Sequence, residues 1–333
     1  MKNYLNNLII LPGLYFRLVR NLKYQRRFIQ KILSAELEVS KETNDNTIDD
    51  QDYKKITDYY GYAVPAILGE SFCILRGSAM SLKERKALTY LGAISGLFDD
   101  FFDKKDLTES YIKKLIEQPE KQPGKNASEK LFISFYNNAL EHAVDENLVK
   151  SYFFNVFDAQ IQSKKQMCAE TIIDDIEHIT YLKGGISFLF YSSIFGENKN
   201  EKERMMIYKL GALMQLENDI FDVYKDHQDG IRTMVTSAKS INHLRKTYVA
   251  LTEEIFDLAR GINYPAKNIK LFLRIISMVI CRGFVCLDML ESLESLTNNT
   301  FTIAGYARKD LICDMEKPGN FFRTIHYYAN CNF

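Results

Sequence analysis

The sequence contains no tryptophan, only six prolines among 333 residues, and no excess of charge of either sign. Four of the prolines lie in segments that otherwise look like connections between helices. Lysine plus arginine and aspartate plus glutamate number 43 each, so no net electrostatic field favours nucleic acid or an anionic membrane. No uninterrupted apolar run approaches the length needed to cross a bilayer. The composition therefore argues against a nucleic-acid-binding protein and against a transmembrane segment.

The chain also lacks cysteine pairs at spacings typical of metal sites. Its six cysteines include no CxxC pair and no ligand-like spacing with histidine. Such cysteines are typical of reduced, mostly buried thiols, so we expect a cytoplasmic protein. With 46% hydrophobic residues, the chain is long enough to bury a large core, as one large domain or as two modest ones.

The N-terminal segment does not have the order of a signal peptide. A short apolar patch, Leu8 to Leu11, is ended by Pro12 and is followed, not preceded, by basic residues such as Arg17 and Arg20. The pattern is basic and amphipathic, so the only membrane contact we expect is a weak one at the surface.

Helical periodicity dominates the rest of the sequence, and strand-like alternation is scarce. Ser81 and Glu84 form a capping-box pattern, so a helix is expected from there to about Asp103. A polar stretch over 41–51 follows an N-terminal helix, and residues 118–125 are expected to form a surface loop. We predict an all-α protein, with an N-terminal helix and polar linker in 1–50 and one large helical bundle in 51–333. Further helices are expected over 127–143, 146–168, 172–195, 202–227, 238–260, 266–296 and 301–315.

Two acidic clusters stand out because each is embedded in an apolar run. Asp99 and Asp103 are four residues apart and share one face of a helix, about 6 Å apart along its axis. Asn218, Asp222 and Asp226 form a second stripe by the same spacing. Both clusters are expected near helix C-termini, where the helix dipole makes a carboxylate locally unfavourable. Carboxylates in such places need a cation, and Mg²⁺ typically takes one or two carboxylates plus substrate phosphates.

These motifs resemble those of class I isoprenoid synthases. Asp99-Asp-Phe-Phe-Asp103 is similar to their DDxxD motif, and Asn218 to Asp226 is similar to the second metal motif of terpene cyclases, Asn-Asp-x-x-Ser/Thr-x-x-x-Glu. Asp222 replaces the usual Ser or Thr, and Asp226 replaces the usual Glu. The wider stretch from Gln215 to Arg232 is almost as similar to squalene and phytoene synthases. The resemblance covers roughly residues 55 to 315, and it implies a bundle of the class I isoprenoid synthase type with a central apolar pocket.

The resemblance implies a catalytic metal site that holds magnesium, with three ions expected. Its ligands would come from both motifs, whereas Asp100 and Asp219 point about 100° away from the stripes and are expected to play structural roles. The alternative is that both clusters are simply solvated helix ends, which their Phe and Ile neighbours disfavour. The expected catalytic and metal-binding residues are Asp99, Asp103, Asn218, Asp222 and Asp226.

The resemblance also suggests substrate-binding residues. Lys183 precedes Gly184 and Gly185, two adjacent glycines that indicate a helix break or close packing. In the superfamily a broken helix lines the pocket at this point, and Lys183 would bind diphosphate; the alternative is a plain kink with a solvated lysine. Tyr306 and Arg308 lie about where cyclases close the pocket with an Arg-Tyr pair, although in inverted order, and the alternative for Arg308 is an ordinary surface charge. Aromatic faces stabilise carbocations in a dry site. The candidates are Lys183, Lys225, Arg232, Arg308, Phe98 and Phe102.

The function that we expect is that of a terpene synthase, a lyase that ionises a linear prenyl diphosphate and cyclises or eliminates the cation. The first alternative is a head-to-head condensing enzyme like squalene or phytoene synthase, and Phe221 argues against it because those enzymes have arginine there. A chain-elongating prenyltransferase is disfavoured because the second motif of those enzymes normally begins Asp-Asp, and this chain has Asn218 at the first position. The remaining alternative is a non-catalytic helical interaction protein, which predicts interrupted ligand stripes. Besides the substrate, the partner to test is a second copy of the chain in a homodimer.

Overall fold

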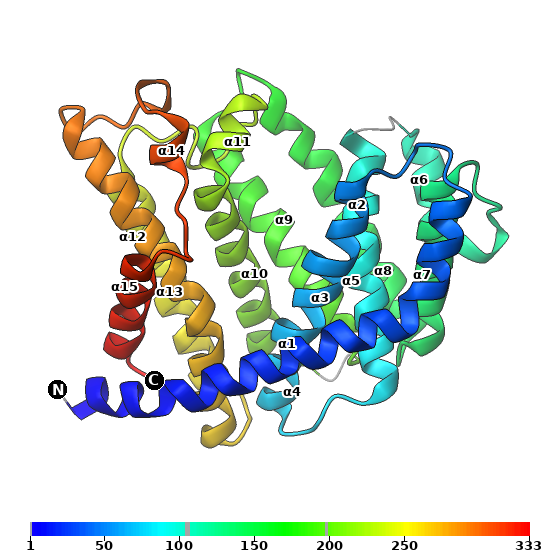
Figure 1. The fold of residues 1–333 in the computed structure, drawn as a ribbon, viewed down its shortest axis with the longest axis horizontal. Helices are drawn as coiled ribbons and strands as arrows, with labels where there is room; N and C mark the ends of the chain where they lie inside the picture. The colour runs from blue at the N-terminus through cyan, green and yellow to red at the C-terminus, as the bar shows by residue number, and fades with distance from the viewer. Residues whose placement is uncertain (1, 104–106, 197–198) are drawn as a thin grey trace. The chain divides into compact units, whose positions relative to one another are not determined.

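The computed structural model describes residues 2–103, 107–196 and 199–333, apart from the side chains of Lys2 and Asp103. All regular elements in these ranges are helices (Figure 1). The prediction of an all-α protein is therefore confirmed. Two compact units are distinguished, each with its own core. The "aromatic unit" comprises Gly13–Gln160 and Phe190–Asn198, and the "C-terminal unit" comprises Met1–Pro12, Ile161–Leu189 and Lys199–Phe333.

The aromatic unit is built around α5 (Leu82–Asp103), which packs against α7 (Ala127–His142). The capping box predicted at its start is present: Ser81 N–H donates to Glu84 Oε2 at 2.7 Å, and Glu84 N–H donates to Ser81 Oγ at 3.2 Å. The other helices here are most of α1 (Lys2–Glu42), α2 (Asp50–Lys54), α3 (Gly61–Ala63), α4 (Glu70–Arg76), α6 (Glu109–Glu117) and α8 (Glu146–Ser163). Two π-helical segments, Lys55–Tyr60 and Val64–Gly69, join α2, α3 and α4.

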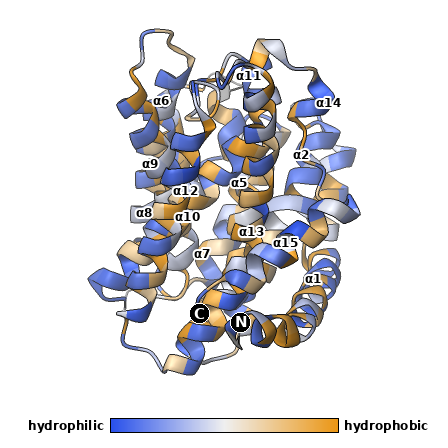
Figure 2. Cartoon of the chain, turned by 90° about the vertical axis from the view of Figure 1, so that its left-hand side faces the viewer, coloured by the Kyte–Doolittle hydropathy of each residue, from blue (hydrophilic) through white to orange (hydrophobic). Residues whose placement is uncertain are grey.

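The C-terminal unit is centred on α10 (Glu201–Phe221), which packs against α12 (Ile241–Arg260) and α13 (Ala266–Leu296). The C-terminal helix α15 (Pro318–Asn330) lies against α13. The remaining elements are α9 (Ile173–Ser193), which extends into the aromatic unit, α11 (Val223–Gln228) and α14 (Arg308–Leu311). Hydrophobic and hydrophilic residues alternate along most helices (Figure 2), as expected when one side of each faces a core.

Most of the predicted helices are present within a few residues of their expected ends. The helix expected over 146–168 ends at Ser163 and continues as a 3₁₀ turn, Lys164–Met167. The helix predicted over 301–315 is wrong: this segment has only a 3₁₀ turn, Ile303–Gly305, and the short α14. Phe301, Ile303 and Leu311 are buried from an irregular backbone, and their burial imitates a helical pattern. The sequence prediction lacks α2, α3 and α4 with the π-helical segments that join them, and it also lacks α6 and α15.

Within the ranges described, no helix is both long enough and apolar enough to cross a membrane. All six cysteines are free, and four of them are buried, which agrees with the expectation of mostly buried thiols.

Candidate functional site

The second acidic motif spans the junction between α10 and α11. Asp222 leaves helical geometry at this junction, with φ −92° and ψ 9°. Hydrogen bonds of helical spacing nevertheless continue through it: Asp222 N–H donates to the Asn218 carbonyl at 2.8 Å, and Asp226 N–H donates to the Asp222 carbonyl at 2.9 Å. The stripe of Asn218, Asp222 and Asp226 predicted from the spacing is therefore preserved across the break.

The side chains of the stripe range from exposed to buried. Asn218 is exposed, and its Nδ2 lies 3.5 Å from Asp222 Oδ2, at the limit of a hydrogen bond. Asp226 is only 8% exposed. Burial and the nearby negative charge of Asp222 raise the pKa of Asp226 to about 6, although Lys225 and Lys183 oppose the shift. A carboxyl group in this position would gain from a nearby cation.

Asp219 points into the unit instead of joining the stripe, as the 100° offset predicts. Gln215 Nε2 donates to its Oδ1 at 2.8 Å, and Thr180 Oγ1 from α9 donates to its Oδ2 at 3.4 Å. Burial raises the pKa of Asp219 to about 7; these hydrogen bonds and Lys183 oppose the shift, while Asp226 adds to it. Its role is to tie α9 to α10 beside the stripe.

Close packing of α9 against α10 brings Lys183 to this cluster. A Cβ atom added at Gly184 would lie 2.2 Å from the carbonyl oxygen of Gly211, and one added at Gly185 would lie 2.4 Å from the ring of Tyr208. Only glycine permits this approach. The helix runs unbroken through both glycines, so the expected break is wrong and the close-packing alternative is correct. Lys183 is half-buried, near enough to Asp219 and Asp226 to lower the pKa of both.

The other predicted cations lie in different surroundings. Lys225 is exposed on α11. Arg308 on α14 is also exposed, and its guanidinium lies 5.6 Å from the ring centroid of Tyr224, so the chain does bring Arg308 beside the second motif. Arg232 donates from Nη1 to the carbonyls of Ala169 and Thr171 and so braces a loop.

The first acidic motif lies at the C-terminal end of α5, in the aromatic unit. Asp99 is half-buried, and its Oδ1 accepts a hydrogen bond from Gln160 Nε2 of α8. Burial raises the pKa of Tyr191, the hydrogen bond between its hydroxyl and Ser95 Oγ at 2.7 Å opposes the shift, and the charge of Asp99 adds to it. The side chain of Asp103 lies outside the described residues, although α5 ends at Asp103 as predicted.

Asp100 is buried, and it faces the π-helical segment Lys55–Tyr60. Lys55 Nζ lies 3.1 Å from Asp100 Oδ1 and 3.3 Å from Asp52 Oδ1. Burial and a hydrogen bond with Asp52 raise the pKa of Asp100, and Lys55 opposes that shift. Gly96 makes room, because a Cβ atom there would lie 2.8 Å from Lys55 Cδ. Asp100 is thus a structural residue, as its offset from Asp99 predicts.

Aromatic rings fill the interior next to the first motif. Phe98 is 2% exposed and lies 4.6 Å from Phe153 and 5.2 Å from Phe102, measured between ring centroids. Phe102 retains some exposed surface and lies 5.7 Å from Phe157. Of the two predicted aromatic residues, Phe98 is therefore a packed core residue, and Phe102 is the one with surface available to a ligand.

The sequence did not identify several partners of these motifs. Gln160, Tyr191, Thr180 and Lys55 come from helices far away in the sequence, so no local spacing marks them. Gln215 is the exception, because it lies four residues before Asp219 and shares its helix face.

Among the side chains that the structure describes, no group of three or more His, Cys, Asp or Glu residues is placed to hold a metal ion. The second motif does not need such a group: two carboxylates, one amide oxygen and phosphate oxygens complete a magnesium shell. The hard oxygen donors of Asn218, Asp222 and Asp226, and the raised pKa of Asp226, fit that ion.

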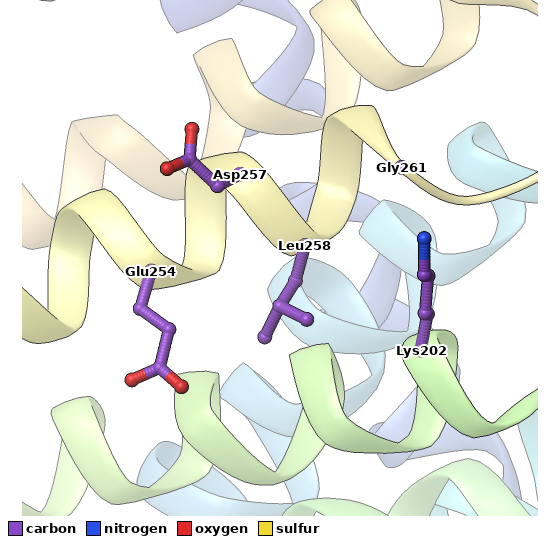
Figure 3. A pocket seen from close by; sticks show the side chains of 5 residues that line it. All are labelled: Lys202, Glu254, Asp257, Leu258 and Gly261. Carbon is purple, nitrogen blue, oxygen red and sulfur yellow. The ribbon is translucent and has the colours of Figure 1, made fainter.

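A separate hollow of about 460 Å³ lies between α10 and α12 (Figure 3). Lys202 points from α10 toward α12, whereas Glu254 points from α12 toward α10. Glu254 is already paired with Lys209 at 3.0 Å. None of the predicted site residues lines this hollow, which is open and carries charges of both signs.

Comparison with known proteins finds no family model that matches this chain and no curated protein that matches it.

Proposed function

We propose that this protein is a magnesium-dependent class I terpene synthase that ionises a linear prenyl diphosphate. The observation that carries the proposal is the arrangement of Asn218, Asp222 and Asp226 on one stripe, with the pKa of Asp226 raised to about 6 beside Lys183. Residues with strongly shifted pKa values cluster at functional sites, and a carboxylate stripe is suited to a cation.

In this proposal, Asn218, Asp222 and Asp226 hold magnesium, and Asp99 and Asp103 supply the second set of ligands. When bound, magnesium would polarise the diphosphate and stabilise its departure. Lys183 lies beside Asp226, so its ammonium would bind diphosphate oxygens at the same place. Arg308, whose guanidinium lies 5.6 Å from the ring centroid of Tyr224, would add a second cation near Asp222 and Asp226.

The aromatic interior supports the second half of the reaction. A carbocation survives only where water is excluded, and ring faces stabilise it. Phe102 has exposed surface and is backed by the buried rings of Phe98 and Phe157. We propose that Phe102 contacts the prenyl chain. That both motifs serve one site remains a prediction.

The direct test is incubation with Mg²⁺ and geranyl, farnesyl or geranylgeranyl diphosphate, followed by measurement of pyrophosphate and of extractable hydrocarbons. We expect pyrophosphate release together with a terpene hydrocarbon or alcohol. Parallel reactions with isopentenyl diphosphate and with NADPH identify condensing activity. No pyrophosphate from any substrate, with the protein folded and Mg²⁺ present, would refute the proposal.

A further inference from the structure

The first 35 residues of the chain have a charge that contrasts with the neutral whole. They contain seven lysines and arginines and no aspartate or glutamate, and Glu36 is the first acidic residue. All except Met1 lie in the single helix α1. A segment so basic within a protein of zero net charge has a local positive field that the overall composition conceals.

One side of α1 is fixed inward by polar contacts. Asn7 Nδ2 donates to the carbonyl of Ala329 at 3.1 Å and to that of Cys331 at 2.9 Å. Gln25 Nε2 donates to the carbonyl of Gly61 at 3.0 Å and to Thr89 Oγ1 at 2.9 Å. These contacts set the rotation of the helix about its own axis, and so they determine which residues face outward.

The outward side of α1 carries an apolar half and a basic half. Leu5, Ile9 and Phe16 are 56%, 77% and 70% exposed. Exposed Arg20, Lys23 and Arg27 continue the same spacing of three or four residues. We refer to this row, positions 5, 9, 12, 16, 20, 23 and 27, as the "α1 stripe". Large apolar side chains exposed in a row mark an interaction surface.

We propose that the α1 stripe binds the surface of an anionic lipid bilayer, with its apolar residues inserted at the interface and its basic residues against lipid phosphates. The combination decides the partner. Nucleic acid would pair with Arg20, Lys23 and Arg27 but would leave Ile9 and Phe16 in water. A second copy of this stripe would oppose like charges if parallel, and if antiparallel and fully overlapped it would set its basic half against the apolar half. An interfacial helix uses both halves at once. The inference does not depend on the proposed reaction.

The test is co-sedimentation of the full-length protein with phosphatidylcholine vesicles, with and without phosphatidylglycerol. We expect binding to the anionic vesicles, weakened by raising the salt from about 0.1 M to about 1 M because the charges are screened. Lys23→Gln with Arg27→Gln should weaken binding about 30-fold, at roughly fivefold per charge. Phe16→Ser should weaken it about tenfold.

Each variant has a matched control. Lys267→Gln with Lys270→Gln removes the same charge from exposed positions on α13, and Phe322→Ser removes a ring that is 66% exposed on α15. Both controls should bind like the unaltered protein, and circular dichroism should confirm that every variant is folded. Absence of binding to anionic vesicles, or equal losses in variants and controls, would overturn the proposal. So would tight binding of a nucleic-acid oligomer that vesicles do not displace, or dimerisation through the stripe without vesicle binding.

Discussion

The two acidic motifs differ in the groups that stabilise their buried carboxyl side chains. In the first motif, buried Asp100 has a lysine partner, Lys55 at 3.1 Å, and Asp99 accepts a hydrogen bond from Gln160. In the second motif, Asp219 and Asp226 rely on hydrogen bonds and on a more distant Lys183, and their pKa values rise to about 7 and about 6. Burial disfavours the charged forms of Asp219 and Asp226, so an added cation should act strongly at the second motif.

The largest expected effect is on the rate of pyrophosphate release, and it should distinguish a residue of the stripe from an exposed neighbour. Asp226→Asn should lower the rate of pyrophosphate release about a thousandfold, because a metal ligand and its charge are lost. Asp229→Asn is the matched control: Asp229 is exposed, three residues further on, and its loss should leave the rate within about twofold. Asp99→Asn should match Asp226→Asn if both motifs hold the cations. Full activity in Asp99→Asn would remove the first motif from the site.

A second prediction tests the charge compensation of the first motif. Lys55→Met removes the ammonium that lies 3.1 Å from Asp100 Oδ1 and 3.3 Å from Asp52 Oδ1, and it should cost about 2 to 3 kcal/mol of unfolding free energy. Lys54→Met changes an exposed neighbour and should stay within about 0.5 kcal/mol. Urea denaturation of the three proteins gives the comparison. Equal stability of the two variants would mean that Lys55 does not stabilise Asp100.

A third prediction concerns pH and the second motif, measured with a chelator present. A carboxyl whose pKa is raised in the folded state stabilises the fold while protonated, so that stability is lost as pH rises through the raised value. Between pH 5 and 8, the Asp219 pKa of about 7 accounts for a loss of about 2 to 3 kcal/mol.

Asp219→Asn should remove this part of the pH dependence, because an amide does not ionise, whereas Asp229→Asn should retain it. Glu217 and Asp226, whose pKa values burial raises to about 7 and about 6, titrate over the same range in all three proteins, so that the difference reports Asp219 together with its interaction with Asp226. Parallel stability curves for Asp219→Asn and the unaltered protein would contradict the assignment.

The smallest expected effect is ligand stabilisation. Mg²⁺ and inorganic diphosphate together, at about ten times the dissociation constant, should raise the unfolding free energy by about 1.4 kcal/mol. Either component alone should do less, since each leaves charge uncompensated. A melting series with Mg²⁺, diphosphate, both, and Ca²⁺ measures this, and Asp226→Asn should abolish the shift. A combined effect no larger than the single additions would exclude a joint site.

Local pattern was sufficient for much of this molecule. The capping box at Ser81 follows from its local motif, Ser81 and Glu84 three residues apart. The stripe of Asn218, Asp222 and Asp226 follows from spacing, because helical geometry places residues four apart on one face. The inward orientation of Asp100 and Asp219 follows from the 100° rotation between successive residues of a helix. The helix predicted over 301–315 is wrong, because apolar residues buried from an irregular backbone gave the same sequence pattern as a helix.

Sequence by itself determined which residues share a helix face, and hence both acidic motifs and the basic, acid-free character of the first 35 residues. Tertiary structure decided what those faces meet. Gly184 and Gly211 let α9 approach α10 closely enough for Lys183 and Thr180 to act on Asp219, and Lys55 reaches Asp100 from 45 residues away in the chain. Such contacts depend on packing between distant segments, because the energy of a buried charge is set by its surroundings in space and not by its neighbours in sequence.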